Sequence, residues 1–169
     1  MTDRTDDLFA PVDGTWGRVS PRLATVRRIL AVVAALLAVA IGVVLLVVPA
    51  AAWAAVVGGV LVAAAVIATP WTWWWAERNR RSWGYAENAD DLLVTRGVMF
   101  KRLVAIPYGR MQFVDVEAGP LARAFGIATV TLHTASPETA AEIPGLPAAE
   151  ATRLRNRLTE LGEAHGAGL

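Results

Sequence analysis

The distribution of charged positions divides this chain into two halves. From Ile29 to Ala76 it contains no Asp, Glu, Lys or Arg, and Pro49 followed by three alanines interrupts the apolar run. The first length, Ile29–Val48, covers about 20 residues, or roughly 30 Å as a helix, which matches the hydrocarbon thickness of a bilayer. Its aliphatic side chains contribute about −5 kcal/mol on the insertion scale. We therefore expect a transmembrane helix over residues 29–48.

A second span is expected over residues 53–75, where Ala and Gly replace many of the aliphatic residues. By the same arithmetic it contributes only about −3 kcal/mol, so we expect the two spans to insert together as a hairpin. Small residues recur four apart on both spans, which would let the helices approach closely, although an Ala-rich chain also produces such rows by chance. These rows are Ala34, Ala38 and Gly42 on the first span, and Ala51, Ala55, Gly59 and Ala63 on the second.

Arginine sets the expected orientation. Arg18, Arg22, Arg27 and Arg28 precede the first span, a second cluster follows the second span, and the connecting turn is uncharged. The positive-inside rule then places both termini in the cytoplasm, with the hairpin in the plasma (inner) membrane. Tryptophans before the second cluster suit an interfacial belt, or alternatively a ligand-binding cluster. The side chains expected to face lipid are Arg78, Arg80, Arg81, Trp73, Trp74 and Trp75.

The first span has a rival interpretation as a signal peptide, because Val48 to Ala52 resembles a small-residue cleavage site. The region before it is long and contains several aspartates, and the apolar core exceeds the usual length, so we favour an uncleaved span. Residues 1–22, which contain several Pro and Gly, are expected to be a mobile cytoplasmic leader. The hairpin then occupies residues 23–81.

After Arg81 the apolar residues alternate with polar ones, which is typical of half-buried strands. A short strand is expected over Ser82–Ala86, with a turn over residues 87–90. Asp91–Arg96 and Val98–Pro107 are expected to form a hairpin that turns tightly at Gly97, with Val98, Phe100, Val104 and Ile106 on one face. Further strands are expected over Met111–Ala118, Thr129–Thr134 and Ala141–Ile143.

The chain closes with an amphipathic helix from about Pro147 to Gly162. Pro147 suits a first helical turn, and Leu154, Leu158 and Leu161 share one face. Antiparallel strands followed by one such helix predict an α+β domain over residues 82–163, with a tail over 164–169. The expected fold is thus a membrane α-helical hairpin plus a small antiparallel β-barrel or sheet capped by a C-terminal helix.

Five sequence blocks from Trp83 onward carry a resemblance to a known family. In order, they are WGY, LLVTRGVMFKR, IPYGRMQFVDV, GPLARAFGIATVTLHTA and IPGL. Together with the preceding hairpin, they resemble the bacterial PH-like domain of YdbS-type membrane proteins. The resemblance implies a pleckstrin-homology-like barrel and suggests, as a partner, a larger relative with several such domains. It supplies no catalytic residues.

The candidates for chemistry each have a simpler explanation. Asp115 and Glu117 share a strand face and could act as an acid–base pair, but a solvated outer face explains them better. His133 lies near Ser136 without a nucleophile elbow, and with His165 it forms no metal-binding spacing. The segment Gly119–Gly126 lacks the Gly-Lys-Ser/Thr of a phosphate loop, so we expect a turn there. No catalytic group, cofactor or metal is therefore expected.

Charge and composition narrow the partners further. The net charge of +1 argues against nucleic-acid binding, and the absence of cysteine excludes disulfides and thiol chemistry. The basic residues of the domain could face anionic lipid together with the arginines after the second span. They are Arg96, Lys101, Arg102, Arg110 and Arg123. The acidic turn over residues 87–91, taken as the equivalent of the first hairpin loop of phosphoinositide-binding PH domains, argues against that ligand.

These observations predict a non-enzymatic membrane protein that presents a PH-like domain at the inner leaflet for protein–protein interaction or scaffolding. Strand addition is the expected binding mode, with Arg110, Gln112 and Arg123 as the expected contact surface. A homo-oligomer packed through its helices is a further expectation. The alternative is a membrane sensor that binds anionic lipid. A transport subunit is a weaker alternative, since neither span carries an ionisable group.

Overall fold

The computed structural model describes residues 16–48, 52–135 and 140–166. The chain forms two compact units. The first is a helical hairpin over residues 24–78, and the second combines the residues before it with residues 79–169. The expected connecting turn at residues 49–51 lies outside the described residues.

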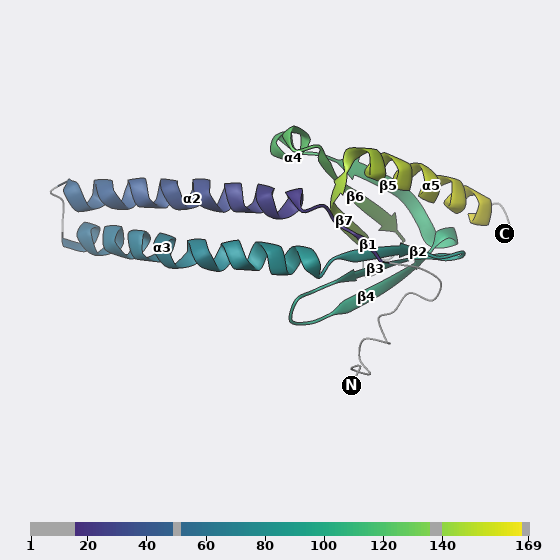
Figure 1. Ribbon diagram of the computed structural model, residues 1–169, viewed down its shortest axis with the longest axis horizontal. Helices are drawn as coiled ribbons and strands as arrows, with labels where there is room; N and C mark the ends of the chain where they lie inside the picture. The colour runs from purple at the N-terminus through teal and green to yellow at the C-terminus, as the bar shows by residue number, and fades with distance from the viewer. Residues whose placement is uncertain (1–15, 49–51, 136–139, 167–169) are drawn as a thin grey trace. The chain divides into compact units, whose positions relative to one another are not determined.

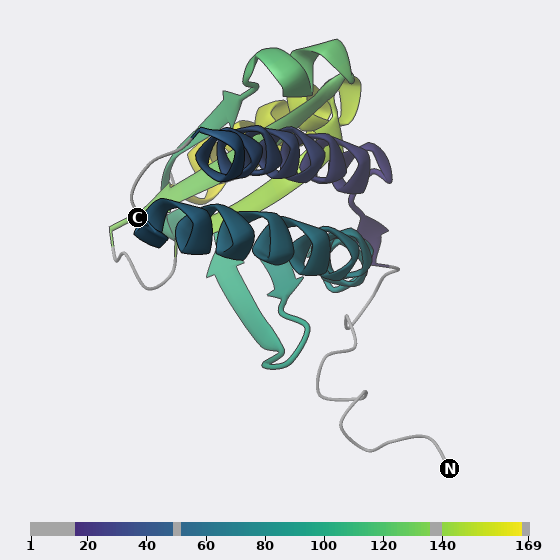
Figure 2. The ribbon, with the colours of Figure 1, turned by 90° about the vertical axis from the view of Figure 1, so that its left-hand side faces the viewer.

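The hairpin consists of α2 (Arg22–Val47) and α3 (Ala52–Arg81), which run side by side in both ribbon views (Figures 1 and 2). Both helices are long and apolar enough to cross a membrane. α2 begins before the first expected span, and α3 continues past the second one. Arginine is a good helix former, so the arginine-bearing segments beside the spans are helical too. Large aliphatic side chains are exposed along both helices, which is the distribution expected where lipid rather than water is the solvent.

The two helices approach each other closely at two glycines. A Cβ atom added at Gly58 would lie 2.6 Å from the Gly42 carbonyl oxygen, and one added at Gly42 would lie 2.8 Å from the Gly58 carbonyl oxygen. Gly59 has open space around its Cα. The prediction that Gly42 faces the second helix is therefore confirmed. The prediction that Gly59 faces the first helix is wrong, because the preceding residue, Gly58, makes the contact. Spacing alone does not decide which of two adjacent glycines faces the neighbouring helix.

The second unit contains two antiparallel sheets and a C-terminal helix. The first sheet has the order β1-β2-β3-β4 and the second has the order β5-β6-β7. A 3-10 turn, η1 (Tyr108–Arg110), joins the sheets, and a short helix, α4 (Pro120–Ala124), joins β5 to β6. The strands are β1 (Gly17–Arg18), β2 (Gly84–Glu87), β3 (Asp91–Arg96), β4 (Arg102–Pro107), β5 (Met111–Glu117), β6 (Ile127–Thr134) and β7 (Ala141–Pro147).

The helical hairpin is an insertion between the first two strands of the domain. Arg18, the last residue of β1, is the register partner of Gly84, the first residue of β2. The expected mobile leader over residues 1–22 therefore differs from the structure, because residues 16–22 belong to the domain, while residues 1–15 lie outside the described residues. A two-residue strand shows no periodicity in the sequence and exists only through its pairing with β2.

The core of the domain lies between the sheets and α5 (Ala148–Gly166), which lies across the second sheet in Figure 1. The expected leucine stripe is confirmed, since Leu154 and Leu158 are fully buried and Leu161 is half-buried. The helix runs four residues beyond its expected end and includes part of the expected tail. At its last turn the His165 ring packs on Tyr108, with 5.8 Å between ring centroids.

Two strands differ from expectation in an informative way. β7 continues through Pro144 and Gly145, because Gly145 adopts a φ of +71° that lets the strand bend without ending. β4 begins only at Arg102, so the expected common face of Val98, Phe100, Val104 and Ile106 is wrong for the first two residues. Ile106 is buried, whereas Phe100 lies in an exposed loop.

Candidate functional site

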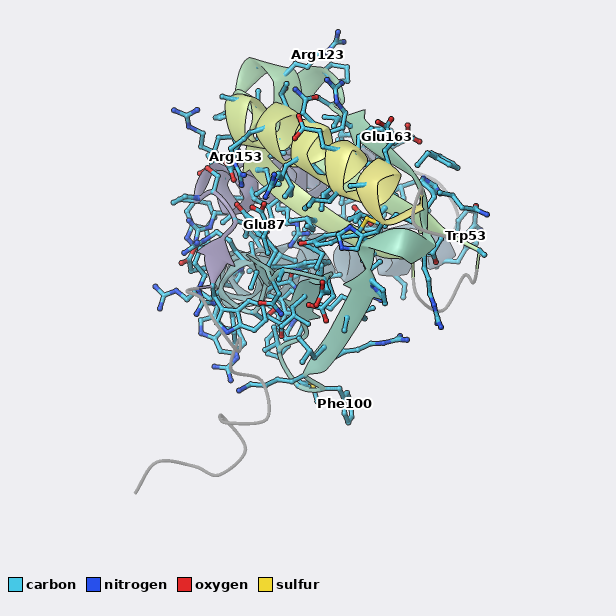
Figure 3. All side chains as sticks on the ribbon, turned by 90° about the vertical axis from the view of Figure 1, so that its right-hand side faces the viewer. Trp53, Glu87, Phe100, Arg123, Arg153 and Glu163 are labelled. Atoms are coloured by element: carbon cyan, nitrogen blue, oxygen red, sulfur yellow. The ribbon has the colours of Figure 1, made fainter. Side chains whose placement is uncertain are left out.

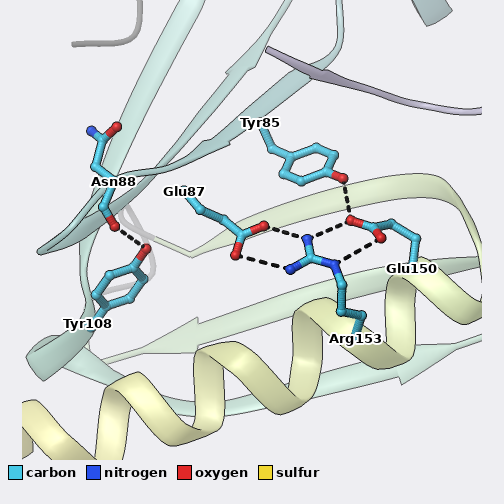
Figure 4. A network of polar contacts seen from close by, with 6 residues as sticks. All are labelled: Tyr85, Glu87, Asn88, Tyr108, Glu150 and Arg153. Carbon is cyan, nitrogen blue, oxygen red and sulfur yellow. Dashed lines mark hydrogen bonds and ion pairs between the residues drawn. The ribbon is translucent and has the colours of Figure 1, made fainter. Parts of the chain in front are cut away.

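Arg153 is the centre of a polar cluster that joins four side chains (Figure 4). Its guanidinium donates hydrogen bonds to Glu87 at the end of β2 and to Glu150 one turn earlier on α5. Tyr85 completes the cluster by donating its hydroxyl proton to Glu150, at 2.8 Å. Tyr85 and Glu87 come from β2, and Glu150 and Arg153 come from α5, so the contacts join the helix to the first sheet. The cluster therefore acts as a structural clamp.

The pKa shifts in this cluster follow from the same contacts. Hydrogen bonds from Arg153 lower the pKa of the Glu150 carboxyl, and the two carboxylates raise the pKa of Arg153. Burial, reinforced by the hydrogen bond to Glu150, raises the pKa of Tyr85 to about 12. These shifts hold Tyr85, Glu150 and Arg153 in their usual charge states at neutral pH. None of these three groups is tuned for proton transfer, which requires a pKa near the working pH.

A groove lies between β5 and α5, with a volume of about 220 Å³. This is smaller than the roughly 300–1,000 Å³ typical of small-molecule pockets, so the groove suits a few side chains better than a cofactor. One wall comes from the first half of β5 and the other from the last turns of α5. The lining residues are Met111, Gln112, Phe113, Val114, Leu158, Thr159, Gly162 and Glu163.

The strand beside this groove has an unpaired edge. Within the residues that the structure describes, β5 pairs with β6 alone. The register shifts between Met111 and Phe113, so that Gln112 has no register partner on β6. Such an edge presents backbone donors and acceptors that an added strand can use.

Phe113 is the apolar side chain that stands out at this edge, with 52% of its surface exposed. Its ring stacks on His133, with 4.1 Å between centroids and 12° between planes. His133 in turn lies 3.5 Å from the Asp115 carboxylate on the same outer face. The Phe113 ring therefore lies stacked on its neighbour at the border of the groove.

The sequence candidates for catalysis do not assemble into a site. Asp115 and Glu117 are both exposed, which agrees with a solvated outer face, and Ser136 lies outside the described residues. No group of three potential metal ligands occurs among the residues searched, namely those that the structure describes. The glycine-bearing segment after β5 forms α4, with Gly119 as its N-cap. It is a connection between strands, as expected, although helical.

The expected contact surface is divided between the two ends of β5. Arg110 and Gln112 lie at its beginning, beside the groove, whereas Arg123 lies on α4 beyond its end. Since β5 has seven residues, about 20 Å of strand separates them. Arg123 instead neighbours the start of α2, because Phe125 at the end of α4 accepts a hydrogen bond from Arg22 at 3.1 Å.

The residues expected to face lipid differ in their exposure and in their contacts. Trp73 and Trp74 are exposed, and Trp75 is half-buried in a cluster with Trp71, whose ring stacks on it at 6.5 Å. Arg78 lies over the Trp74 ring at 5.1 Å, so both can reach the membrane interface. The Arg80 guanidinium is half-buried and donates to the Val19 carbonyl, which indicates a structural role. Arg81 is exposed, and its carbonyl accepts a hydrogen bond from Arg18.

Apart from Phe113, the groove has no recognisable signature in the sequence of either wall. Its α5 wall comes from residues on the flank of the leucine stripe, such as Thr159 and Glu163, which look like ordinary solvent-facing positions. The one available signal was Phe113, a large aromatic residue next to polar Gln112 in an alternating strand. The acidic turn over residues 87–91 was expected to correspond to the first hairpin loop of a PH domain. It instead joins β2 to β3, and the connection from β1 to β2 is the pair of membrane helices.

Comparison with known proteins identifies the class. The family model of the bacterial PH domain matches residues 21–162. The chain therefore belongs to the bacterial PH domain family, and the expected PH-like fold is confirmed.

The chain is also similar to the UPF0699 transmembrane protein YdbS of Bacillus subtilis (strain 168), with 34% identity over 79 residues. The alignment covers 47% of this chain and 48% of that protein, so it spans about half the length of the relative. With its two apolar helices, the chain is a membrane protein with two spans. No solved structure matched it.

Proposed function

We propose that this chain is a non-catalytic membrane-anchored interaction module, whose β5 edge takes an extended segment of a partner protein. The observation that carries the proposal is the coincidence of an unpaired strand edge with a narrow groove under α5. An added strand would gain backbone hydrogen bonds along β5, and alternate side chains of the partner would enter the groove.

The dimensions of the groove favour a short segment. Met111–Val114 offers four residues of strand edge, or about 13 Å. One turn of α5 faces this length and supplies Leu158 as an apolar floor, with Thr159 and Glu163 at the rim. A partner segment with an apolar residue at its centre and a polar or basic residue at its end fits this lining.

The hairpin contributes to binding by confinement. A domain tethered to the bilayer by two spans meets other membrane proteins at a high effective concentration, so that a weak strand addition suffices. We propose the cytoplasm as the side on which the domain lies, on the basis of the arginines that flank both spans. A larger membrane protein with several PH-like domains is the proposed partner, since such a protein would share the same two-dimensional space.

The test uses a photoreactive residue at Thr159, in the groove, in full-length protein expressed in cells. The matched control carries the same residue at Ala164, which is exposed on the other side of the same helix, five residues further on. We expect a covalent adduct with another protein at position 159 and not at position 164. Thr159→Trp, which fills the groove, should abolish capture by a purified partner, whereas Ala164→Trp should preserve it.

Equal adducts at both positions, or none at position 159, would refute the proposed groove. A thermal unfolding measurement on both tryptophan variants separates a blocked groove from a damaged domain, since the proposal requires the two variants to unfold at similar temperatures.

A further inference from the structure

The loop between β3 and β4 exposes two large apolar side chains. Met99 is 78% exposed and Phe100 is 86% exposed, the highest values among large apolar residues in the described part of the chain. Apart from Phe113 beside the groove, no other large apolar side chain of the domain is classed as exposed there. Clustered apolar residues on an otherwise well-buried domain mark a contact surface.

The backbone of the loop holds these side chains outward. Gly97 has a φ of +109°, and a Cβ atom there would lie 1.9 Å from the Phe100 carbonyl oxygen, so only glycine allows the chain to turn this tightly. The strands beneath remain in register up to the pair Arg96 and Arg102. Figure 3 shows Phe100 at the tip of this loop, well away from Glu87 and Arg153.

The register places this loop at a particular end of the first sheet. Gly84 at the start of β2 pairs with Arg18 on one side and with Thr95 on the other. The chain therefore passes to both membrane helices at the same sheet end from which the β3–β4 loop projects. Only Ser82 and Trp83 separate Arg81, the last residue of α3, from β2. A chain of that length reaches about 10 Å at most.

Charge distinguishes this end of the domain from the other. Arg96 precedes the loop and lies over the Trp83 ring at 5.9 Å, while Lys101 and Arg102 follow the tip and are exposed. Arg22 is at the same end, where it donates a hydrogen bond to the Phe125 carbonyl after α4. The acidic residues near it are Glu117, at the end of β5, and Glu150, in the first turn of α5. The opposite end, at the β2–β3 turn, carries Asp90 and Asp91.

We propose that the β3–β4 loop is a second membrane contact, in which Met99 and Phe100 enter the lipid interface while Lys101 and Arg102 meet anionic headgroups. Apolar side chains flanked by cations suit the boundary between acyl chains and phosphates. Lipid is the occupant because only residues 19–21 and 82–83 separate this end of the sheet from the two spanning helices. The contact would orient the domain and leave the beginning of β5, with its groove, facing away from the membrane.

The absence of cysteine makes a direct test available. Full-length protein with Met99→Cys carries an environment-sensitive fluorophore and is reconstituted in phosphatidylcholine vesicles with and without phosphatidylglycerol. The matched control is Ala89→Cys, an exposed position in the turn at the other end of the same sheet. We expect a blue-shifted emission at position 99 and strong quenching by nitroxide-labelled lipids, and neither effect at position 89.

Anionic lipid should increase the quenching at position 99, and the additional change Lys101→Glu with Arg102→Glu should remove that increase. Emission at position 99 that remains as water-exposed as at position 89 would overturn the proposal. A blue shift that nitroxide lipids do not quench would also overturn it, because the loop would then be covered by protein. Neither result depends on the groove beside β5.

Discussion

The hairpin and the PH-like domain bury their apolar residues in opposite ways. In the described part of the chain, all but three of the exposed large apolar side chains lie on the hairpin, and those three are Met99, Phe100 and Phe113. The domain instead encloses its leucines, isoleucines and valines between two sheets and α5. Exposing an apolar side chain is unfavourable in water and not in lipid, so the same residue types lie outside on the hairpin and inside in the domain.

The difference shows where each unit obtains its stability. In the domain, burial of apolar surface is the main driving force, whereas two helices in lipid gain little from burial and depend on close backbone packing. The three exceptions in the domain are then informative, because each lies at a proposed contact. Phe113 borders the groove, and Met99 and Phe100 form the tip of the β3–β4 loop.

The largest expected effect comes from truncating the domain core. Leu132 on β6 is fully buried, so Leu132→Ala should lower the free energy of unfolding of the domain by roughly 2–5 kcal/mol through lost burial and the remaining cavity. Leu37→Ala, at a position 60% exposed on α2, should leave it nearly unchanged. Denaturant unfolding of the full-length protein in detergent measures both. Similar losses for the two variants would contradict the contrast between the units.

A smaller effect is expected from overfilling the helix contact. Gly58→Leu places a side chain against the Gly42 carbonyl and should force the helices apart at a cost of roughly 1–3 kcal/mol. Gly59→Leu, one residue further on, points into open space and serves as the control. The distance between spin labels on α2 and α3 should increase only in the first variant. An increase in the second would show that the other glycine makes the contact.

The smallest effect concerns the clamp between α5 and the first sheet. Arg153→Met should cost about 1 kcal/mol or less, because the guanidinium is half exposed to solvent. Arg153 lowers the pKa of Glu150, so its contribution is complete above the ordinary pKa of 4.5 and is lost as the pH falls through the lowered value. The variant should therefore lose part of its acid dependence, as measured by thermal unfolding between pH 2 and pH 7.

The titration of Tyr85 at alkaline pH provides an internal control for the Arg153→Met variant. Burial, the main cause, raises the pKa of Tyr85 to about 12, so its contribution is complete below pH 10 and is lost as the pH rises toward 12. This alkaline dependence should persist in Arg153→Met. If it disappears together with the acid dependence, the variant has disturbed the packing of α5 rather than one ion pair.

The pattern of apolar residues within a single segment was sufficient to predict most helices and strands. The charge-free run predicted both membrane helices, alternation predicted β3, β5 and β6 within two residues, and the leucine stripe predicted α5. In each case the apolar period of a single segment carries the information. The β4 strand shows the limit, because Val98 and Phe100 continue its alternation while Gly97 directs them into the exposed loop.

Neither proposed contact surface could be predicted in the same way. The groove requires β5 and the flank of α5, which lie more than 40 residues apart, and each wall alone has the composition of ordinary surface. The proposed membrane contact of the β3–β4 loop depends on the pairing of Gly84 with Arg18 and Thr95, which places the loop at the sheet end that connects to both helices. Sequence periodicity describes one segment at a time and cannot report such pairings.

The amino-acid sequence alone thus determined that the chain crosses a membrane twice and carries a small antiparallel domain, because burial in lipid or in a core imposes a period on each segment. Only the tertiary structure decided that β1 makes the hairpin an insertion in the first sheet, that Gly58 rather than Gly59 packs on Gly42, and that Met99 and Phe100 are exposed. These features depend on which segments meet. That choice is made by the packing of the whole unit rather than by local preference.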